Sequence, residues 1–275
     1  MLKNVIKEHP LTSYFIIASM STWILLMPLV LTGLGILSVN IIWHALGAFG
    51  PTIAAILVTY ISQGKDGLVK LKERCFKWRV KWIWVIIVIF GPFALFGLGI
   101  LINFLFTRIW FDFYAFIVEN GLVTVGAVLA WVWVNAFAYG IFEEIGWRGF
   151  ALPRLQQKYI AIRATTILWI FWGLWHIPMF FYKLPLAMAP LWALGMYIGA
   201  IIMTFIFNST QGSVLMGIFF HITNNIVMVF DVFMIATIIS IEMSLLAILI
   251  VWKWGPEKLS TGEKIILEVK NKMVV

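Results

Sequence analysis

Long apolar runs are the feature that most constrains this chain. Runs of about 18 or more apolar residues recur along it, and each is long enough to cross ~30 Å of hydrocarbon as a helix. Only 12% of the residues are charged, about half of what soluble domains carry. The short alternating segments of a membrane barrel are absent from the sequence. Since backbone groups in lipid must be hydrogen-bonded internally, we predict an all-α polytopic membrane protein.

We expect about eight transmembrane helices within a single membrane domain, residues 1–275. The approximate spans are 13–35, 42–62, 82–106, 122–149, 165–182, 186–207, 212–230 and 232–252. Lys and Arg gather before the first helix, in segment 64–81, after the fourth helix and in the tail after Trp252. With eight helices these four regions lie on one side of the membrane. The positive-inside rule then predicts a multi-pass protein of the cell membrane with both termini in the cytoplasm.

Charge and cysteine content exclude several other kinds of site. The net charge of +8 does not indicate nucleic acid binding, because membrane topology and anionic lipid explain basic residues at helix ends. Cys75 is the single cysteine, which excludes an internal disulfide and any metal site of several cysteines. His9 and His44 lie near predicted helix ends, where we expect solvated interface residues. Segment 64–81 is compatible with a basic amphipathic helix on the inner leaflet.

Two adjacent carboxylates, Glu143 and Glu144, lie in the fourth predicted helix. Ionisable side chains inside membrane helices are costly and indicate a functional site. Glu144 and Arg148 are four residues apart, so they share a helix face and can form an ion pair. Glu143 points about 100° away from Glu144 and lacks such a partner, so we predict that it is a general base acting on water. Taken alone, the motif is also compatible with a structural ion pair at a helix end.

Two histidine motifs lie in later helices. His176 follows Trp172 by four residues in the fifth predicted helix, and His221 precedes Asn225 by four in the seventh, so each pair shares one face. A lone membrane histidine is more often a hydrogen-bonded core residue than a catalyst. Three polar motifs on three apolar helices, however, indicate one wet cavity. A base, two imidazoles and an amide suit hydrolysis of a peptide bond, through water activation and oxyanion stabilisation.

Taken in order, the three motifs resemble the signature of the CPBP intramembrane protease family: Glu143-Glu144-x-x-x-Arg148, Trp172-x-x-x-His176 and His221-x-x-x-Asn225. That family includes the Rce1-type (type II) CaaX prenyl endopeptidases and the Abi proteins linked to bacteriocin self-immunity. The resemblance covers about residues 135–230, which would form the catalytic core. It implies an eight-helix fold with a cytoplasm-facing polar cavity. One departure is Trp172, where the family often has Phe.

The resemblance also implies a role for each matching residue. Glu143 and His176 would activate water, whereas His221 and Asn225 would stabilise the oxyanion. The residues that support and order the site would be Glu144, Arg148 and Trp172.

The use of a metal stays open at this point. Glu143, His176 and His221 could hold Zn²⁺ with an open coordination position. The same groups could work without a metal, as in a glutamate-dependent protease.

The expected activity is that of an intramembrane endopeptidase similar to the type II CaaX prenyl endopeptidases. Its substrate would be a membrane-bound or lipidated peptide or protein that enters from the cytoplasmic side. One alternative is a non-enzymatic Abi-like membrane protein for bacteriocin immunity or partner binding. Another is a transporter that uses the carboxylates as a proton relay. The sequence indicates no oligomeric state.

The predicted depths of the two water-activating residues do not match. His176 lies about 12 residues, or ~18 Å, into its predicted helix, whereas Glu143 lies only ~6–10 Å from the cytoplasmic end of its own. Glu143 and His176 can meet only if the fourth helix ends later, or the fifth begins deeper, than the predicted spans place them.

Overall fold

The computed structural model describes residues 2–228 and 233–267. The predicted boundary between the last two helices, at 230–232, lies outside the described residues, as does the tail from 268. Within the described ranges every regular element is a helix, which confirms the all-α prediction.

Among the described residues, six helical segments are long and apolar enough to cross a membrane: Pro10–Gly33, Ile41–Cys75, Trp82–Thr107, Val125–Gln156, Leu186–Ser209 and Met234–Trp254. Two shorter apolar helices of 15 residues each, Ala161–Trp175 and Val214–Met228, stand where the fifth and seventh spans were expected. A straight crossing takes about 20 residues. A multi-pass membrane protein is therefore confirmed, whereas eight crossings stay a prediction.

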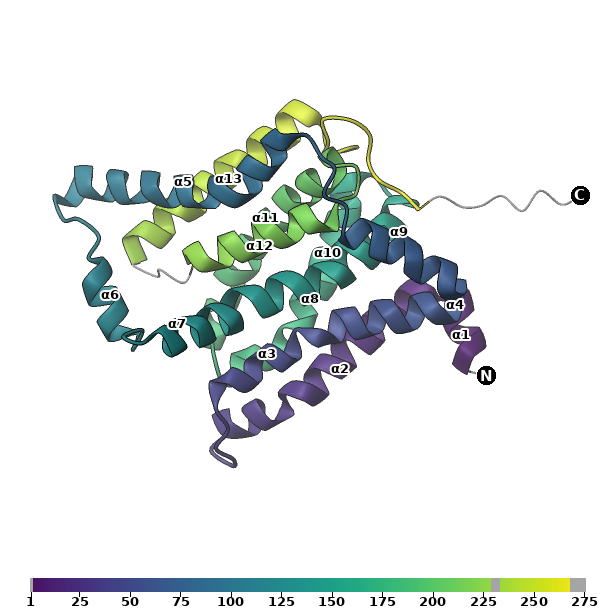
Figure 1. Ribbon diagram of the computed structural model, residues 1–275, viewed down its shortest axis with the longest axis horizontal. Coiled ribbons are helices and arrows are strands. Elements are labelled where there is room, and N and C mark those ends of the chain that lie inside the picture. The colour runs from purple at the N-terminus through teal and green to yellow at the C-terminus, as the bar shows by residue number, and fades with distance from the viewer. Residues whose placement is uncertain (1, 229–232, 268–275) are drawn as a thin grey trace, which may run out of the picture.

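The α-helices are α1 (Leu2–Glu8), α2 (Pro10–Gly33), α3 (His44–Gly47), α4 (Phe49–Cys75), α5 (Trp82–Thr107), α6 (Phe113–Glu119), α7 (Val125–Val132), α8 (Ala138–Gly146), α9 (Leu152–Gln156), α10 (Ala161–Trp175), α11 (Ala189–Ser209), α12 (Val214–Met228) and α13 (Phe233–Trp254). Figure 1 shows α2 and α4 side by side at one edge of the bundle and α5 and α13 at the opposite edge. Between these edges, α8 packs on α4, and α12 packs on both α8 and α5.

The fourth predicted helix ends later than expected. It runs from Val125 through Gln156, with two π-helical turns, η2 (Trp133–Phe137) and η3 (Trp147–Ala151), on either side of α8. The next helix begins at Ala161, before its expected start at 165. Glu143 therefore lies about 13 residues before the end of its helix and His176 about 15 residues after the start of α10, roughly 20 Å in each case. The mismatch in depth disappears with these boundaries.

The helix α4 also continues past its expected end at 62. It bends at Gly64, whose φ of 67° is readily adopted only by glycine, and ends at Cys75. The part after the bend belongs to segment 64–81, which was expected as a helix on the inner leaflet. The segment is helical only as far as Cys75, and Gly67, Leu71 and Cys75, spaced by four, are buried. One face of this segment thus packs on the protein.

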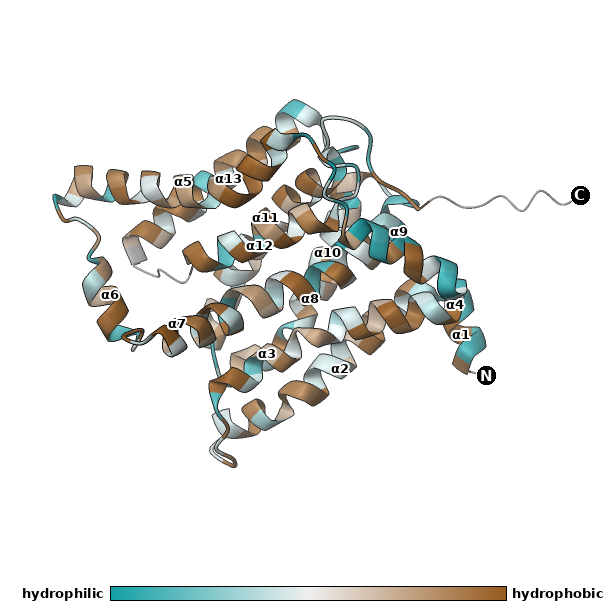
Figure 2. Ribbon diagram, in the orientation of Figure 1, coloured by the Kyte–Doolittle hydropathy of each residue, from teal (hydrophilic) through white to brown (hydrophobic). Residues whose placement is uncertain are grey.

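The basic regions gather at one end of the bundle. This end, on the right of Figure 1, holds α1, the end of α4, the connection from α9 to α10 and segment 255–267. Figure 2 shows its hydrophilic residues beside the mostly hydrophobic helices. The last segment is held there, since Gln156 Nε2 donates to Ile265 O and Asn208 Nδ2 donates to Lys258 O, both over 2.8 Å. The basic regions thus lie at the same end of the bundle, as predicted. That this end faces the cytoplasm stays a prediction.

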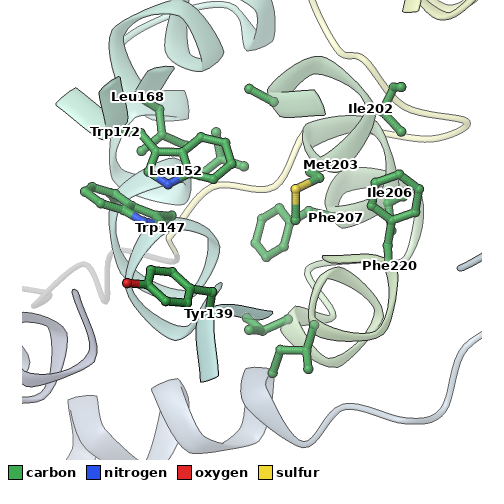
Figure 3. Close-up of a cluster of buried hydrophobic side chains, with 14 of the residues drawn as sticks. Tyr139, Trp147, Leu152, Leu168, Trp172, Ile202, Met203, Ile206, Phe207 and Phe220 are labelled. Carbon is green, nitrogen blue, oxygen red and sulfur yellow. The ribbon is translucent and has the colours of Figure 1, made fainter. Parts of the chain in front are cut away.

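A buried aromatic cluster joins the helices that carry the three motifs. Figure 3 shows Trp147 and Trp172 on one side of it, and Phe207 and Phe220 on the other. Trp147 and Phe207 are completely buried. These large side chains come from η3, α10, α11 and α12, so one core sets the positions of all the site helices.

Candidate active site

Glu143 lies in α8 with its carboxylate held by two indoles. Trp147 Nε1 donates to Glu143 Oε2 over 3.1 Å, and Trp172 Nε1 donates to the same oxygen from α10. Glu143 is only 1% exposed. No hydrogen bond within the described residues reaches its other oxygen, Oε1. That oxygen is therefore available to accept a proton from water.

Glu144 is the centre of a buried ionic cluster. Its Oε1 accepts from Arg148 Nη1 over 2.9 Å and from His221 Nδ1 over 2.8 Å. The Arg148 guanidinium also lies over the Trp172 ring, 4.6 Å from its centroid, where a cation is attracted to the π-face. The ion pair expected from the spacing of Glu144 and Arg148 is present. His221 is a third member, which no spacing within one helix could indicate.

Close approach of α8 and α12 makes this cluster possible. A Cβ on Gly140 would lie 2.5 Å from Ile222 Cγ1 and 3.1 Å from Ile222 N. The first distance is shorter than a Cβ contact can be, and the second is tighter than most such contacts. Glycine thus lets α12 come near enough for His221 to reach Glu144.

Both histidines have a fixed ring orientation. His176 Nδ1 lies 2.7 Å from Trp172 O, and a carbonyl oxygen only accepts, so Nδ1 is the donor. His221 Nδ1 donates to the Glu144 carboxylate in the same way. Each ring is left with Nε2 for a ligand.

The four predicted catalytic residues line one cavity of about 530 Å³: Glu143, His176, His221 and Asn225. Trp172 lines it as well, while Glu144 and Arg148 lie behind its wall, each 0% exposed. Asn225 is half-buried, and no hydrogen bond within residues 2–228 and 233–267 occupies its amide. The remaining wall is mostly apolar and includes Leu191, Trp192, Met196, Met203, Phe220 and Met243.

A second polar group in this cavity was missed by sequence reasoning. The expectation that His44 is a solvated interface residue is wrong, because it is 3% exposed and lines the cavity. His44 Nδ1 lies 2.6 Å from the Tyr182 hydroxyl and 3.0 Å from the Tyr139 hydroxyl, and its Nε2 lies 3.2 Å from Lys183 Nζ. These residues are far apart in the sequence, and only the folded chain brings them together.

This second group also indicates where the cavity leads. His44 begins the helices that run to Cys75, and Lys183 follows the helix that begins at Ala161. Cys75 and Ala161 lie at the basic end of the bundle, so the cavity extends toward the opposite end. The two expectations of a cytoplasm-facing cavity and of cytoplasmic basic loops are therefore at odds in this structure.

The donor set does not form a metal site as it stands. Within the part of the chain that the structure describes, no group of three His, Cys, Asp or Glu side chains could hold a metal ion. The Oε2 atom of Glu143 already accepts two indole N–H donors. Zinc binding by Glu143, His176 and His221 stays a prediction, and the reaction proposed below has no step through a metal.

Comparison with known proteins matches the same region. The family model described as type II CAAX prenyl endopeptidase Rce1-like covers residues 124–227, which contain all three motifs. The curated CAAX prenyl protease 2 of Methanococcus maripaludis is 33% identical over 94 residues, which are 31% of this chain and 35% of that protein. The chain thus matches about a third of the length of this relative. Residues 124–227 thus resemble the Rce1-like family of type II CAAX prenyl endopeptidases, the resemblance that the motifs predicted.

Proposed function

We propose that the chain is an intramembrane endopeptidase that hydrolyses a peptide bond with a water molecule activated by Glu143. The observation that carries this proposal is the arrangement of Glu143, with one oxygen fixed by two indoles and the other free. It shares one cavity with two histidines whose Nδ1 atoms are engaged. The family match supports the peptidase class.

Water activation falls to Glu143 and His176. A water molecule donates one hydrogen bond to Glu143 Oε1 and the other to His176 Nε2. Its oxygen attacks the scissile carbonyl carbon while Glu143 takes its proton, and the C=O electron pair moves to the carbonyl oxygen. When that pair returns, the C–N bond breaks, and Glu143 gives its proton to the leaving amine.

Oxyanion stabilisation falls to His221 and Asn225, one turn apart on α12. His221 presents Nε2–H to the oxyanion when both of its ring nitrogens carry a proton, since Nδ1 already donates to Glu144, and Asn225 offers its amide N–H. The Glu144–Arg148 pair holds His221 in place through Nδ1.

The substrate is a lipidated peptide of the CaaX type. The names of the family and of its archaeal relative favour this class. The apolar wall supports it too, because side chains from α11 and α13 such as Leu191, Met196 and Met243 suit a lipid chain. The substrate enters from the end of the cavity marked by His44 and Lys183.

The test uses purified protein in detergent and quenched lipidated peptides. We expect Glu143→Gln to reduce kcat by about 10²–10⁴-fold, the usual worth of a general base. Glu242→Gln is the matched control, because Glu242 is a carboxylate of α13 outside the cavity lining and should be dispensable. A metal chelator should leave the wild-type rate unchanged.

Two outcomes would contradict the proposal. Turnover by Glu143→Gln at the wild-type rate would show that Glu143 is not the general base. Loss of activity with the chelator and recovery with added Zn²⁺ would replace the water-activation step by a metal-dependent one. If Glu143→Gln keeps the protein's biological function and binds its partner as wild type does, the result would favour the immunity or scaffold alternative.

A further inference from the structure

Lys183 brings a cationic group into the cavity without an anionic partner. It lies between the 3₁₀ turns η4 (Ile177–Phe181) and η5 (Leu186–Met188) and lines the same cavity as Glu143 and His176. In the part of the chain that the structure describes, no Asp or Glu forms an ion pair with Lys183. Its motif-free loop gave no reason to single it out from the sequence.

The ammonium of Lys183 is held by two oriented acceptors. Its Nζ lies 3.2 Å from His44 Nε2 and 3.5 Å from Asn135 Oδ1. Asn135 Nδ2 donates to Trp131 O over 2.9 Å, which turns Oδ1 toward the lysine. The other nitrogen of His44 is engaged by the Tyr182 hydroxyl. An ammonium has three N–H donors, so one remains for a ligand.

This arrangement differs from an ordinary boundary lysine, which extends its ammonium into water. The side chain of Lys183 as a whole is exposed, but its nitrogen turns back to side chains of two other elements. Desolvation there lowers the pKa of Lys183 to about 8. In a cavity whose wall is mostly apolar, a cation with a free donor attracts an anion more strongly than a cation in open water does.

We infer that Lys183, held by His44 and Asn135, forms a subsite that binds a carboxylate of the substrate. The inference rests on the proposed peptidase function and adds a specificity residue to it. The carboxylate has two sources. A CaaX motif ends at the carboxyl terminus of its protein, and an acidic side chain near the scissile bond offers the same group.

The experiment compares full-length wild type with Lys183→Met on two pairs of lipidated peptides. One pair differs by a carboxyl-terminal acid or amide, and the other by Asp or Asn after the scissile bond. Wild type should cleave the anionic member of one pair with a kcat/KM about 10- to 100-fold higher than that of the neutral member. A hydrogen bond to a charged group contributes about this factor. Lys183→Met should lose this preference, so that it cleaves the two members of the pair with equal kcat/KM.

Two controls keep folding defects apart from loss of the subsite. Lys183→Arg keeps the charge and should keep the preference. Lys158→Met removes a lysine at the basic end, outside the cavity lining, and should behave as wild type. Equal preference in wild type and Lys183→Met, or no preference in wild type, would overturn the inference.

A binding measurement separates this inference from the proposed function. Dissociation constants of the four peptides are measured for the single variant Glu143→Gln and for the double variant Glu143→Gln/Lys183→Met. Selective binding that depends on Lys183, together with no cleavage by wild type, would keep the subsite and reject the peptidase. Cleavage without any selectivity in binding or rate would keep the peptidase and reject the subsite.

Discussion

Replacing each of the two adjacent carboxylates by glutamine separates their roles. Glu143→Gln keeps a side-chain oxygen that can accept from the Trp147 and Trp172 indoles. Glu144→Gln removes the negative charge that faces Arg148. We therefore expect the first substitution to lower kcat by about 10²–10⁴-fold with a small effect on stability, and the second to destabilise the fold.

The structure gives the expected size of each effect. Glu144 and Arg148 are both 0% exposed, and the Nε and Nη2 atoms of Arg148 have no hydrogen-bond partner within the described residues. Glu144 Oε1, 2.9 Å from Nη1, is thus its ion-pair contact. Leaving one member of a buried pair uncompensated costs about 3–5 kcal/mol of unfolding free energy. In Glu143→Gln, charged hydrogen bonds become neutral ones, a change of about 1 kcal/mol.

The assay is denaturant unfolding of the detergent-solubilised protein, followed by tryptophan fluorescence, with peptidase rates on the same samples. The double variant Glu144→Gln/Arg148→Gln also removes the orphaned cation. It should recover about 1–3 kcal/mol relative to Glu144→Gln, the coupling typical of residues in contact. Equal destabilisation by the two single substitutions, or wild-type stability of Glu144→Gln, would refute this division of roles.

Three further predictions concern packing, pH and the oxyanion. Gly146→Ala should destabilise by about 1–3 kcal/mol, because its Cβ would lie 2.6 Å from Pro51 Cβ and 2.7 Å from Pro51 O. Gly91→Ala meets nothing within 4 Å and should not lower the thermal midpoint, so equal midpoints of the two variants would contradict this reasoning. The preference for carboxylate peptides should fade as pH rises through about 8, where Lys183 loses its proton, and Lys183→Arg should keep it. An undiminished wild-type preference at pH about 9.5 would count against the subsite, since a lysine with the ordinary pKa near 10.4 is still charged there. Asn225→Ala should lower kcat about 10²–10³-fold with little change in KM, as for other oxyanion donors, and a change in KM alone would argue against that role.

Local geometry made part of the site predictable from the sequence. A separation of four residues places Glu144 beside Arg148 on one helix, and this pair is present. The long apolar runs fix the helical class because lipid offers no other partner for backbone groups. Such features need only the period of the helix and the nature of the solvent.

Contacts between helices were not accessible in the same way. Trp172 donates to Glu143 and His221 to Glu144 only because α12 packs on α8 and α10 contacts the adjoining turn η3. The buried position of His44 depends likewise on Tyr139 and Tyr182, which come from distant parts of the chain.

The end of the fourth helix shows how packing overrides a local pattern. The predicted fourth span ended at 149, and the basic residues from Arg148 onward were expected in the connection that follows it. Instead the helix continues, because Arg148 has a carboxylate partner and Arg154 lies 3.5 Å from the centroid of the Phe150 ring and donates to Phe150 O. Buried arginines with partners are compatible with a helix interior, whereas unpaired ones are not.

The measurement that addresses the catalytic role of Glu143 most directly is cleavage of a lipidated peptide in proteoliposomes, followed by mass spectrometry of both products. Wild type and Glu242→Gln should release the same two fragments, with one water added across a single bond. Glu143→Gln, inserted and folded as wild type, should release them about 10²–10⁴-fold more slowly. Fragments formed by Glu143→Gln at the wild-type rate would contradict the assignment of Glu143 as the base.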